Sequence, residues 1–241
     1  MKAEAIIFDK DGTLLDFDTF WVSVSEGAIA DTLSSVGRAD IPVAPFLEAI
    51  GVHNGKTDIN SVLCKGTYEE IGLVIYDTLS ALGVSADKDK TVATVLEAYI
   101  RNVDKGVIKP TSNELERVLK TFKDSGMYLA VITTDTAKIT EKCLKGLGVY
   151  ELFDRIYTDD GIIPPKPSPD AALDLFARAG ISPSKTIMVG DTMTDVRFAK
   201  NSGISVAILA PDNERRELFA PSADHLISDI SELLNILETE V

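Results

Sequence analysis

The most constraining feature of this sequence is the regular alternation of short apolar runs and helical patterns from residue 109 onward. Short strands that alternate with helices indicate βαβ units, and such units build a parallel sheet. The runs predict buried strands at 128–133, 155–158, 186–189 and 205–209, and helices at 137–147, 170–179 and 196–202. The sequence therefore predicts an α/β fold with a parallel sheet.

Local signals predict where two of the helices begin and end. Thr111 and Glu114 have the spacing of a capping box, and an apolar helical face follows them. Ser168 is expected to cap the helix that has Pro169 at its first position, and Gly180 is expected to end it.

The segment 18–104 differs, because it has helical periodicity and no convincing apolar strand. Three helices are predicted from three apolar sets: Val24, Ile29, Leu33 and Val36; Tyr68, Leu73, Val74 and Leu79; and Val92, Val95, Leu96 and Tyr99. We interpret the segment as an insertion after the first strand, with hinges near Leu15 to Asp18 and at Lys109-Pro110. The predicted domains are residues 1–15 with 109–241, and residues 16–108.

The charge balance narrows the classes of partner. The 38 acidic and 24 basic residues give a net charge of −14, which repels a phosphate backbone and disfavours nucleic-acid binding. No apolar stretch approaches the roughly 20 residues that span a bilayer, so we expect a cytoplasmic protein without membrane attachment. Cys64 and Cys143 lie far apart without companion metal ligands, which favours structural thiols.

Two carboxylates follow the first apolar run of the chain. The run 5–8 predicts a buried strand, and Asp9 and Asp11 come directly after it. Burying ionised carboxylates is costly without a cation or dense hydrogen bonding. The pair therefore points to a metal site or to proton chemistry.

Other polar residues stand at the expected ends of later strands or in the loops beyond them. In an open parallel sheet, ligands bind outside the carboxyl ends of the strands. The residues expected on this edge are Thr133, Thr134, Lys166 and Asp191. We expect them to lie near the first two carboxylates.

Taken in order, these segments resemble the motifs of the haloacid dehalogenase superfamily. They read Asp9-Lys10-Asp11-Gly12-Thr13, Val131-Ile132-Thr133, Lys166-Pro167-Ser168-Pro169-Asp170 and Gly190-Asp191-Thr192-Met193-Thr194-Asp195. Each motif alone is weak, but the four together are specific and span the core. The resemblance is greatest to phosphoglycolate phosphatase-like members. It implies a Rossmann-like three-layer core with a central parallel sheet and an inserted helical cap domain.

The resemblance also implies a reaction and a role for each motif residue. It implies Mg²⁺-dependent hydrolysis of a small phosphate monoester, such as phosphoglycolate or a sugar phosphate, with Asp9 as nucleophile and Asp11 as general acid and base. The expected metal ligands are Asp9, Asp11 through its backbone carbonyl, and Asp191. The expected phosphate-binding residues are Thr133, Thr134 and Lys166, with Thr133 and Lys166 also assigned to catalysis. Asp195 is expected to orient Lys166 or a metal-bound water.

Two other functions remain open from the residues. A sugar-phosphate mutase keeps the same site, but such enzymes tend to carry a His shortly after the first motif, and residues 16–21 contain none. A phospho-accepting signalling module is about half this length and lacks an acid at the position of Asp11. The expected partner is a small phosphorylated metabolite, and the protein is expected to be a monomer or homodimer. Lys10 has no assigned role.

Overall fold

The computed structural model describes residues 3–239 and divides the chain into two compact units. The core unit consists of Met1–Asp16 and Ile108–Val241, and the inserted unit of Phe17–Val107. The chain therefore leaves the core unit once, after the first strand and its turn, and returns once.

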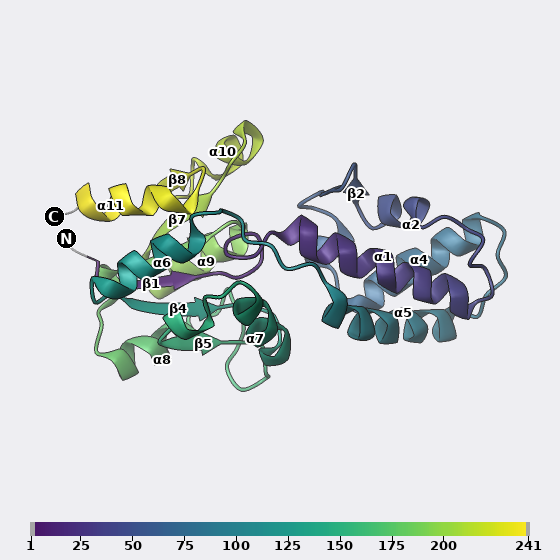
Figure 1. The fold of residues 1–241 in the computed structure, drawn as a ribbon, viewed down its shortest axis with the longest axis horizontal. Helices are drawn as coiled ribbons and strands as arrows, with labels where there is room; N and C mark the ends of the chain where they lie inside the picture. Colours follow the sequence, from purple (N-terminus) through teal and green to yellow (C-terminus); the bar gives the residue numbers. More distant parts are fainter. Residues whose placement is uncertain (1–2, 240–241) are drawn as a thin grey trace. The chain divides into compact units, whose positions relative to one another are not determined.

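The core unit contains a six-stranded sheet in the order β5-β4-β1-β6-β7-β8, with every pair parallel (Figure 1). The strands are β1 (Ala5–Phe8), β4 (Tyr128–Ile132), β5 (Arg155–Tyr157), β6 (Thr186–Gly190), β7 (Ser205–Leu209) and β8 (His225–Ile227). The chain first builds outward from β1 to β5 and then continues on the other side with β6. The strand order therefore reverses between β1 and β6, where such sheets bind ligands.

Helices cover both faces of this sheet, which confirms the predicted three-layer α/β fold (Figure 1). Ile6 and Phe8 point into an apolar cluster with helices α6 (Leu115–Asp124) and α11 (Leu233–Thr239). Ile7 belongs to a cluster with α8 (Asp170–Ala179) and α9 (Met193–Ser202). All four residues of β1 are fully buried, as expected for a central parallel strand. The core unit also contains α7 (Ala137–Gly146) and α10 (Asn213–Phe219).

The inserted unit is mainly helical. Its helices are α1 (Phe17–Ser35), α2 (Ala44–Ala49), α3 (Val62–Lys65), α4 (Tyr68–Ala81) and α5 (Lys88–Asn102). A capping box of Thr67 and Glu70 begins α4, and Asp87 caps α5 through the N–H of Lys90. Inside the unit, the buried Tyr99 hydroxyl pairs with the Ser25 hydroxyl at 2.9 Å. The three long helices α1, α4 and α5 lie where the sequence predicts helices, although Leu96 of α5 is exposed.

The sequence patterns missed some features of the inserted unit. A short hairpin joins β2 (Val52–His53) to β3 (Lys56–Thr57) through Asn54 and Gly55, both of which have positive φ. Asn-Gly is a strong signal for such a turn. The buried side of α4 also differs from the predicted one, because it is formed by Ile71, Ile75 and Leu79 and not by Leu73 and Val74.

Two predicted helix starts are wrong. No side chain caps α6, and the hydroxyl of Thr111 instead donates a hydrogen bond of 2.6 Å to the carbonyl of Thr13. The cap position of α8 is Pro169, and the Ser168 hydroxyl pairs with the Asp170 carboxylate. In both cases, the hydroxyl that was expected to cap the helix forms a hydrogen bond with a different group. Gly180 does end α8, with a left-handed φ of 69°.

The two connections to the inserted unit pair with each other inside the core unit. The N–H of Asp16 donates to the carbonyl of Lys109 at 2.8 Å, and the N–H of Thr111 donates to Leu14 at 3.1 Å. Between these bonds, Leu15 and Pro110 form an isolated antiparallel bridge. The outgoing and returning chains are therefore neighbours.

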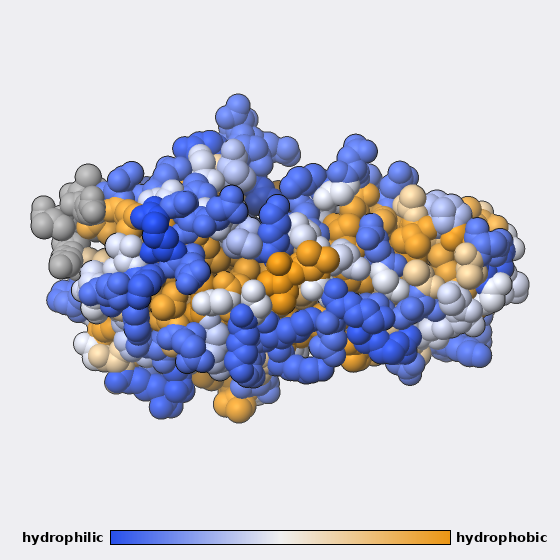
Figure 2. Space-filling view, viewed as in Figure 1, coloured by the Kyte–Doolittle hydropathy of each residue, from blue (hydrophilic) through white to orange (hydrophobic). Residues whose placement is uncertain are grey.

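No helix between residues 3 and 239 is long and apolar enough to cross a membrane. Figure 2 shows that hydrophilic residues cover much of the drawn face, with apolar residues between them.

Candidate active site

The loops that follow three adjacent strands contribute residues to the candidate site. Asp9 follows β1, and its N–H donates to the carbonyl of Val189 in β6 at 2.8 Å. Thr133 follows β4, and Asp191 follows β6. The site therefore lies at the carboxyl ends of the central strands, where the strand order reverses.

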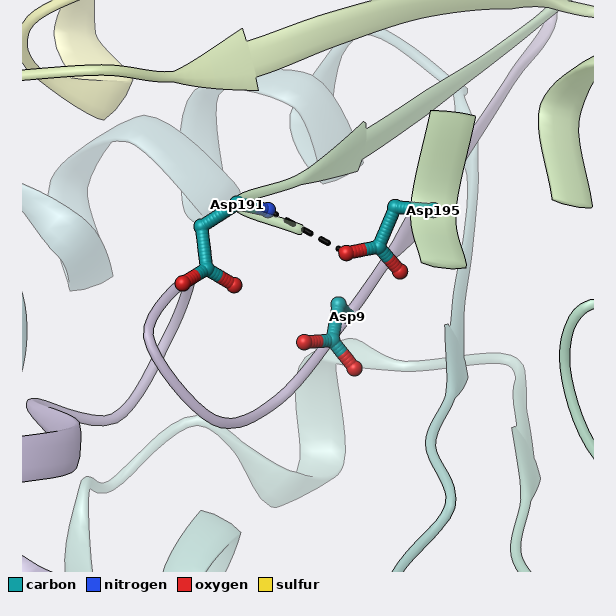
Figure 3. A group of neighbouring side chains, drawn as sticks. All are labelled: Asp9, Asp191 and Asp195. Carbon is teal, nitrogen blue, oxygen red and sulfur yellow. Dashed lines mark hydrogen bonds between the residues drawn. The ribbon is translucent and has the colours of Figure 1, made fainter. Parts of the chain in front are cut away.

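Three carboxylates converge there from the loop after β1, the loop after β6 and the first turn of α9 (Figure 3). Asp9, Asp191 and Asp195 each offer an oxygen, and these oxygens lie within 4.8 Å of one another. Asp195 is held by hydrogen bonds from the N–H groups of Asp191 and Thr192 to its Oδ2, at 3.2 and 3.0 Å. The Thr192 hydroxyl donates to the same oxygen at 2.7 Å.

Lys166 bridges two of these carboxylates. Its buried Nζ lies 2.6 Å from Asp9 Oδ1 and 2.6 Å from Asp195 Oδ1. Burial alone would lower the pKa of Lys166, but the charges of Asp195 and Asp9 outweigh it and raise that pKa, so the ammonium form persists. The structure thus brings Lys166 into contact with Asp195, and Lys166 is one of the two groups that Asp195 was expected to orient.

Three carboxylates and one ammonium leave the cluster with a net negative charge, which makes it fit for a divalent cation. Burial raises the pKa of Asp9 to about 7, with Lys166 opposing the shift and Asp195 adding to it. Burial also raises the pKa of Asp191 well above its usual value, and the charges of Asp9 and Asp195 raise it further. Hard oxygen ligands of this kind suit Mg²⁺, whose charge would favour their ionised forms.

Gly12 allows the first loop to approach Asp191 closely. Its φ is +79°, and a Cβ at this position would lie 2.1 Å from Asp191 Oδ2. The neighbouring Thr13 hydroxyl donates to Asp191 Oδ1 at 3.4 Å. A side chain at position 12 would therefore be strained in its backbone and would displace the Asp191 carboxylate.

The carboxylate of Asp11 contacts a different group, the side chain of Lys10. Lys10 Nζ lies 2.6 Å from Asp11 Oδ2 and 3.1 Å from Asp135 Oδ2. Lys10 is fully buried, which by itself would lower its pKa, but the two carboxylates raise the pKa overall. Burial also raises the pKa of Asp135, against the effect of Lys10. Asp135 was not predicted, although it comes two residues after Thr133 on the same edge of the sheet.

The threonines after β4 differ from each other. Thr133 is buried, and its hydroxyl accepts the N–H of Asp135 at 3.2 Å. Thr134 is exposed. Their assignment to phosphate binding stays a prediction.

Arg215 is a second residue near the site that sequence patterns missed. Its Nη1 lies 3.6 Å from Asp191 Oδ2. Arg215 belongs to α10, which begins after β7 and is capped by the Asp212 carboxylate through the N–H of Arg215. Arg215 lies beyond the carboxyl end of β7, which is next to β6 in the sheet. This position could have predicted it, because ligands bind at that edge of such sheets.

Known proteins resemble this chain along nearly its whole length. The profile of the haloacid dehalogenase-like hydrolases matches residues 56–209. The chain is 26% identical to pyrophosphatase PpaX of Bacillus velezensis, over 98% of this chain and 96% of that one. It is 27% identical to a phosphoglycolate phosphatase of Psychrobacter arcticus, over 85% and 82% of the two chains.

Solved structures share the fold. A crystal structure of a predicted phosphoglycolate phosphatase from Haemophilus somnus aligns with a TM-score of 0.71 at 19% identity, covering 98% of both chains. The HAD-hydrolase YfnB from Bacillus subtilis, bound to magnesium, aligns with a TM-score of 0.66 at 18% identity, covering 99% of this chain and 100% of YfnB.

Proposed function

Because this chain belongs to the haloacid dehalogenase-like hydrolase family, we propose that it is a magnesium-dependent phosphatase that forms an aspartyl-phosphate on Asp9. The observation that carries the proposal is the position of Asp9, between Lys166 and the carboxylate of Asp191. A carboxylate held between a fixed ammonium and a metal-binding group is suited to attack phosphorus. In this proposal residues 1–15 and 109–241 form the catalytic core, and residues 16–108 form its cap domain.

The proposed ligands of Mg²⁺ are Asp9, Asp191 and the backbone carbonyl of Asp11. When bound, the ion supplies positive charge to the phosphoryl oxygens. Asp195 belongs to the same cluster, but Lys166 occupies its Oδ1 and the N–H groups and hydroxyl of the α9 cap occupy its Oδ2. These contacts favour an orienting role for Asp195. The magnesium in the YfnB structure supports the choice of metal.

Hydrolysis then takes two steps, and the protein groups account for every bond. In the first, an Asp9 oxygen forms a bond to phosphorus, the ester P–O bond breaks, and the Asp11 carboxyl gives its proton to the leaving oxygen. In the second step, water gives a proton to Asp11 and its oxygen forms a bond to phosphorus. The bond between Asp9 and phosphorus breaks, so that phosphate is released and the Asp9 carboxylate is restored. Lys166, Thr133 and nearby backbone N–H groups are proposed to bind the phosphoryl oxygens during both steps.

The proposed substrate is a small phosphate monoester such as phosphoglycolate or a sugar phosphate. The likeness to a phosphoglycolate phosphatase supports it. The end-to-end match with a pyrophosphatase makes inorganic pyrophosphate a second candidate. A sugar-phosphate mutase remains the alternative reaction, and it differs by returning the phosphoryl group to the sugar.

The test measures inorganic phosphate released from a panel of phosphoglycolate, sugar phosphates and pyrophosphate, with and without magnesium. We expect magnesium-dependent release that Asp9→Asn abolishes and Asp11→Asn slows by about 10²- to 10⁴-fold, the usual contribution of general acid–base catalysis. Asp124→Asn, an exposed carboxylate at the end of α6, is the matched control and should leave release unchanged. Full turnover by Asp9→Asn would exclude the mechanism.

A further inference from the structure

Lys10 is a fully buried lysine that the mechanism above does not use. Its ammonium contacts Asp11 at 2.6 Å and Asp135 at 3.1 Å, and both contacts are ion pairs. Buried ion pairs are weak evidence for stability, because apolar side chains of similar volume often do as well. Because Lys10 lies directly beside Asp11, the residue proposed as both acid and base, its buried charge points to a functional role.

The backbone of Lys10 is fixed by the turn that follows β1. Its carbonyl accepts the N–H groups of Leu14 and Leu15, each at 2.9 Å. The turn therefore holds the start of the side chain, and only the ammonium end is left to be placed by its partners.

Asp135 is held firmly enough to act as the anchor for that ammonium. Its N–H donates to the Thr133 hydroxyl at 3.2 Å, and its Oδ1 accepts the N–H of Thr136 at 2.8 Å. Its carbonyl accepts the N–H of Asp159 at 2.9 Å. Lys10 thus links a fixed carboxylate in the loop after β4 to Asp11, whose side chain is one-fifth exposed.

We propose that Lys10, anchored by Asp135, is a positioning residue that fixes the carboxyl of Asp11 for proton transfer. The proposal rests on the phosphatase function above. Lys10 acts only through Asp11, so its loss should affect reactions according to their need for a proton. Alkoxide leaving groups need one, whereas p-nitrophenolate leaves without it.

The assay compares kcat/KM for two substrates: p-nitrophenyl phosphate and the alkyl phosphate that the wild type hydrolyses fastest. This parameter covers the steps up to departure of the leaving group, so the later use of Asp11 as a base does not mask the difference. For Lys10→Met we expect about a 10- to 100-fold loss with the alkyl phosphate, part of the usual contribution of general acid catalysis, and less than about threefold with p-nitrophenyl phosphate.

The double variant Lys10→Met/Asp135→Asn guards against a simple folding defect. It removes both buried charges, so neither is left unpaired, but Asp11 still loses its support. We expect a normal melting curve and the same selective loss. Asp135→Asn alone, which leaves Lys10 beside Asp11, should give a smaller loss in the same sense.

Lys123→Met is the matched control, because Lys123 forms a partly exposed ion pair with Asp154 at 2.5 Å outside the site. It should keep wild-type kcat/KM for both substrates. An equal loss on both substrates in the double variant, or no loss on either, overturns the positioning role while the phosphatase function stands. A wild-type protein that releases phosphate from p-nitrophenyl phosphate and from every substrate of the panel at no measurable rate overturns the proposed function itself.

Discussion

Replacing Gly12 by alanine should separate backbone strain from damage to the metal site. The φ of +79° costs an alanine about 1–2 kcal/mol, because its Cβ crowds the carbonyl in the left-handed region. The new Cβ would also lie 2.1 Å from Asp191 Oδ2, well inside any ordinary contact. Asp191 must therefore move by roughly 1 Å, a distance comparable to the precision that functional groups require.

Such a displacement should weaken magnesium binding. Mg²⁺ demands near-ideal geometry from its ligands, so we expect its affinity to fall at least tenfold, or about 1.4 kcal/mol. At saturating magnesium, the stabilisation that the ion gives the folded protein should fall by the same amount. Calorimetric titration of magnesium, and melting curves with and without it, measure these two quantities without relying on turnover.

Gly126→Ala is the matched control. Gly126 has a φ of +85° and no atom within 4 Å of the added Cβ, so it carries the same backbone strain without the collision. It also precedes β4, at the edge of the sheet opposite the site. We expect a similar loss of stability and unchanged magnesium binding. Wild-type affinity in a folded Gly12→Ala protein, or equal weakening in both variants, would refute the reasoning.

Two further predictions concern stability. Thr111→Val removes the 2.6 Å hydrogen bond to Thr13 and should cost about 0.5–1.5 kcal/mol in urea unfolding. Thr121→Val removes only an exposed hydrogen bond within α6 and should cost much less. The pKa of Cys143 is raised from 9.0 to about 11 by burial, so the folded protein binds the thiol proton more tightly and stability should fall between pH 9 and 11. Cys143→Ala should reduce that fall, and identical pH profiles for the two proteins would contradict the cause.

The regular part of the fold was predictable because its signals are local. Four consecutive apolar residues at Ala5–Phe8, followed by two acids, predict a buried strand that ends at a polar edge, and the structure has that strand. The same reasoning located β4, β6 and β7 to within a residue at each end. Three-residue edge strands give only a weak signal in the sequence: β5 was predicted, whereas β8 was not.

Distant polar contacts could not be predicted from residue types. Thr111 has the spacing of a helix cap, yet its hydroxyl is used by the carbonyl of Thr13, nearly a hundred residues away. Lys10 and Asp135 likewise meet only because β1 and β4 are neighbours in the sheet. The order of the motifs indicated which residues would meet near Asp9, whereas the side-chain partner of Asp11 required the structure. The chemical roles of these residues stay predictions until the variants are measured.

The pairing of Leu14–Asp16 with Lys109–Thr111 has a consequence for how this chain tolerates change in length. The pairing closes a loop that contains the 91 residues from Phe17 to Val107. The entropy lost on closing a loop grows only with the logarithm of its length, by about 0.6 kcal/mol for each doubling. Segments of very different size could thus be exchanged at this one point at little cost to the core, which leaves evolution free to replace the inserted unit while the strand ends and their carboxylates remain the same.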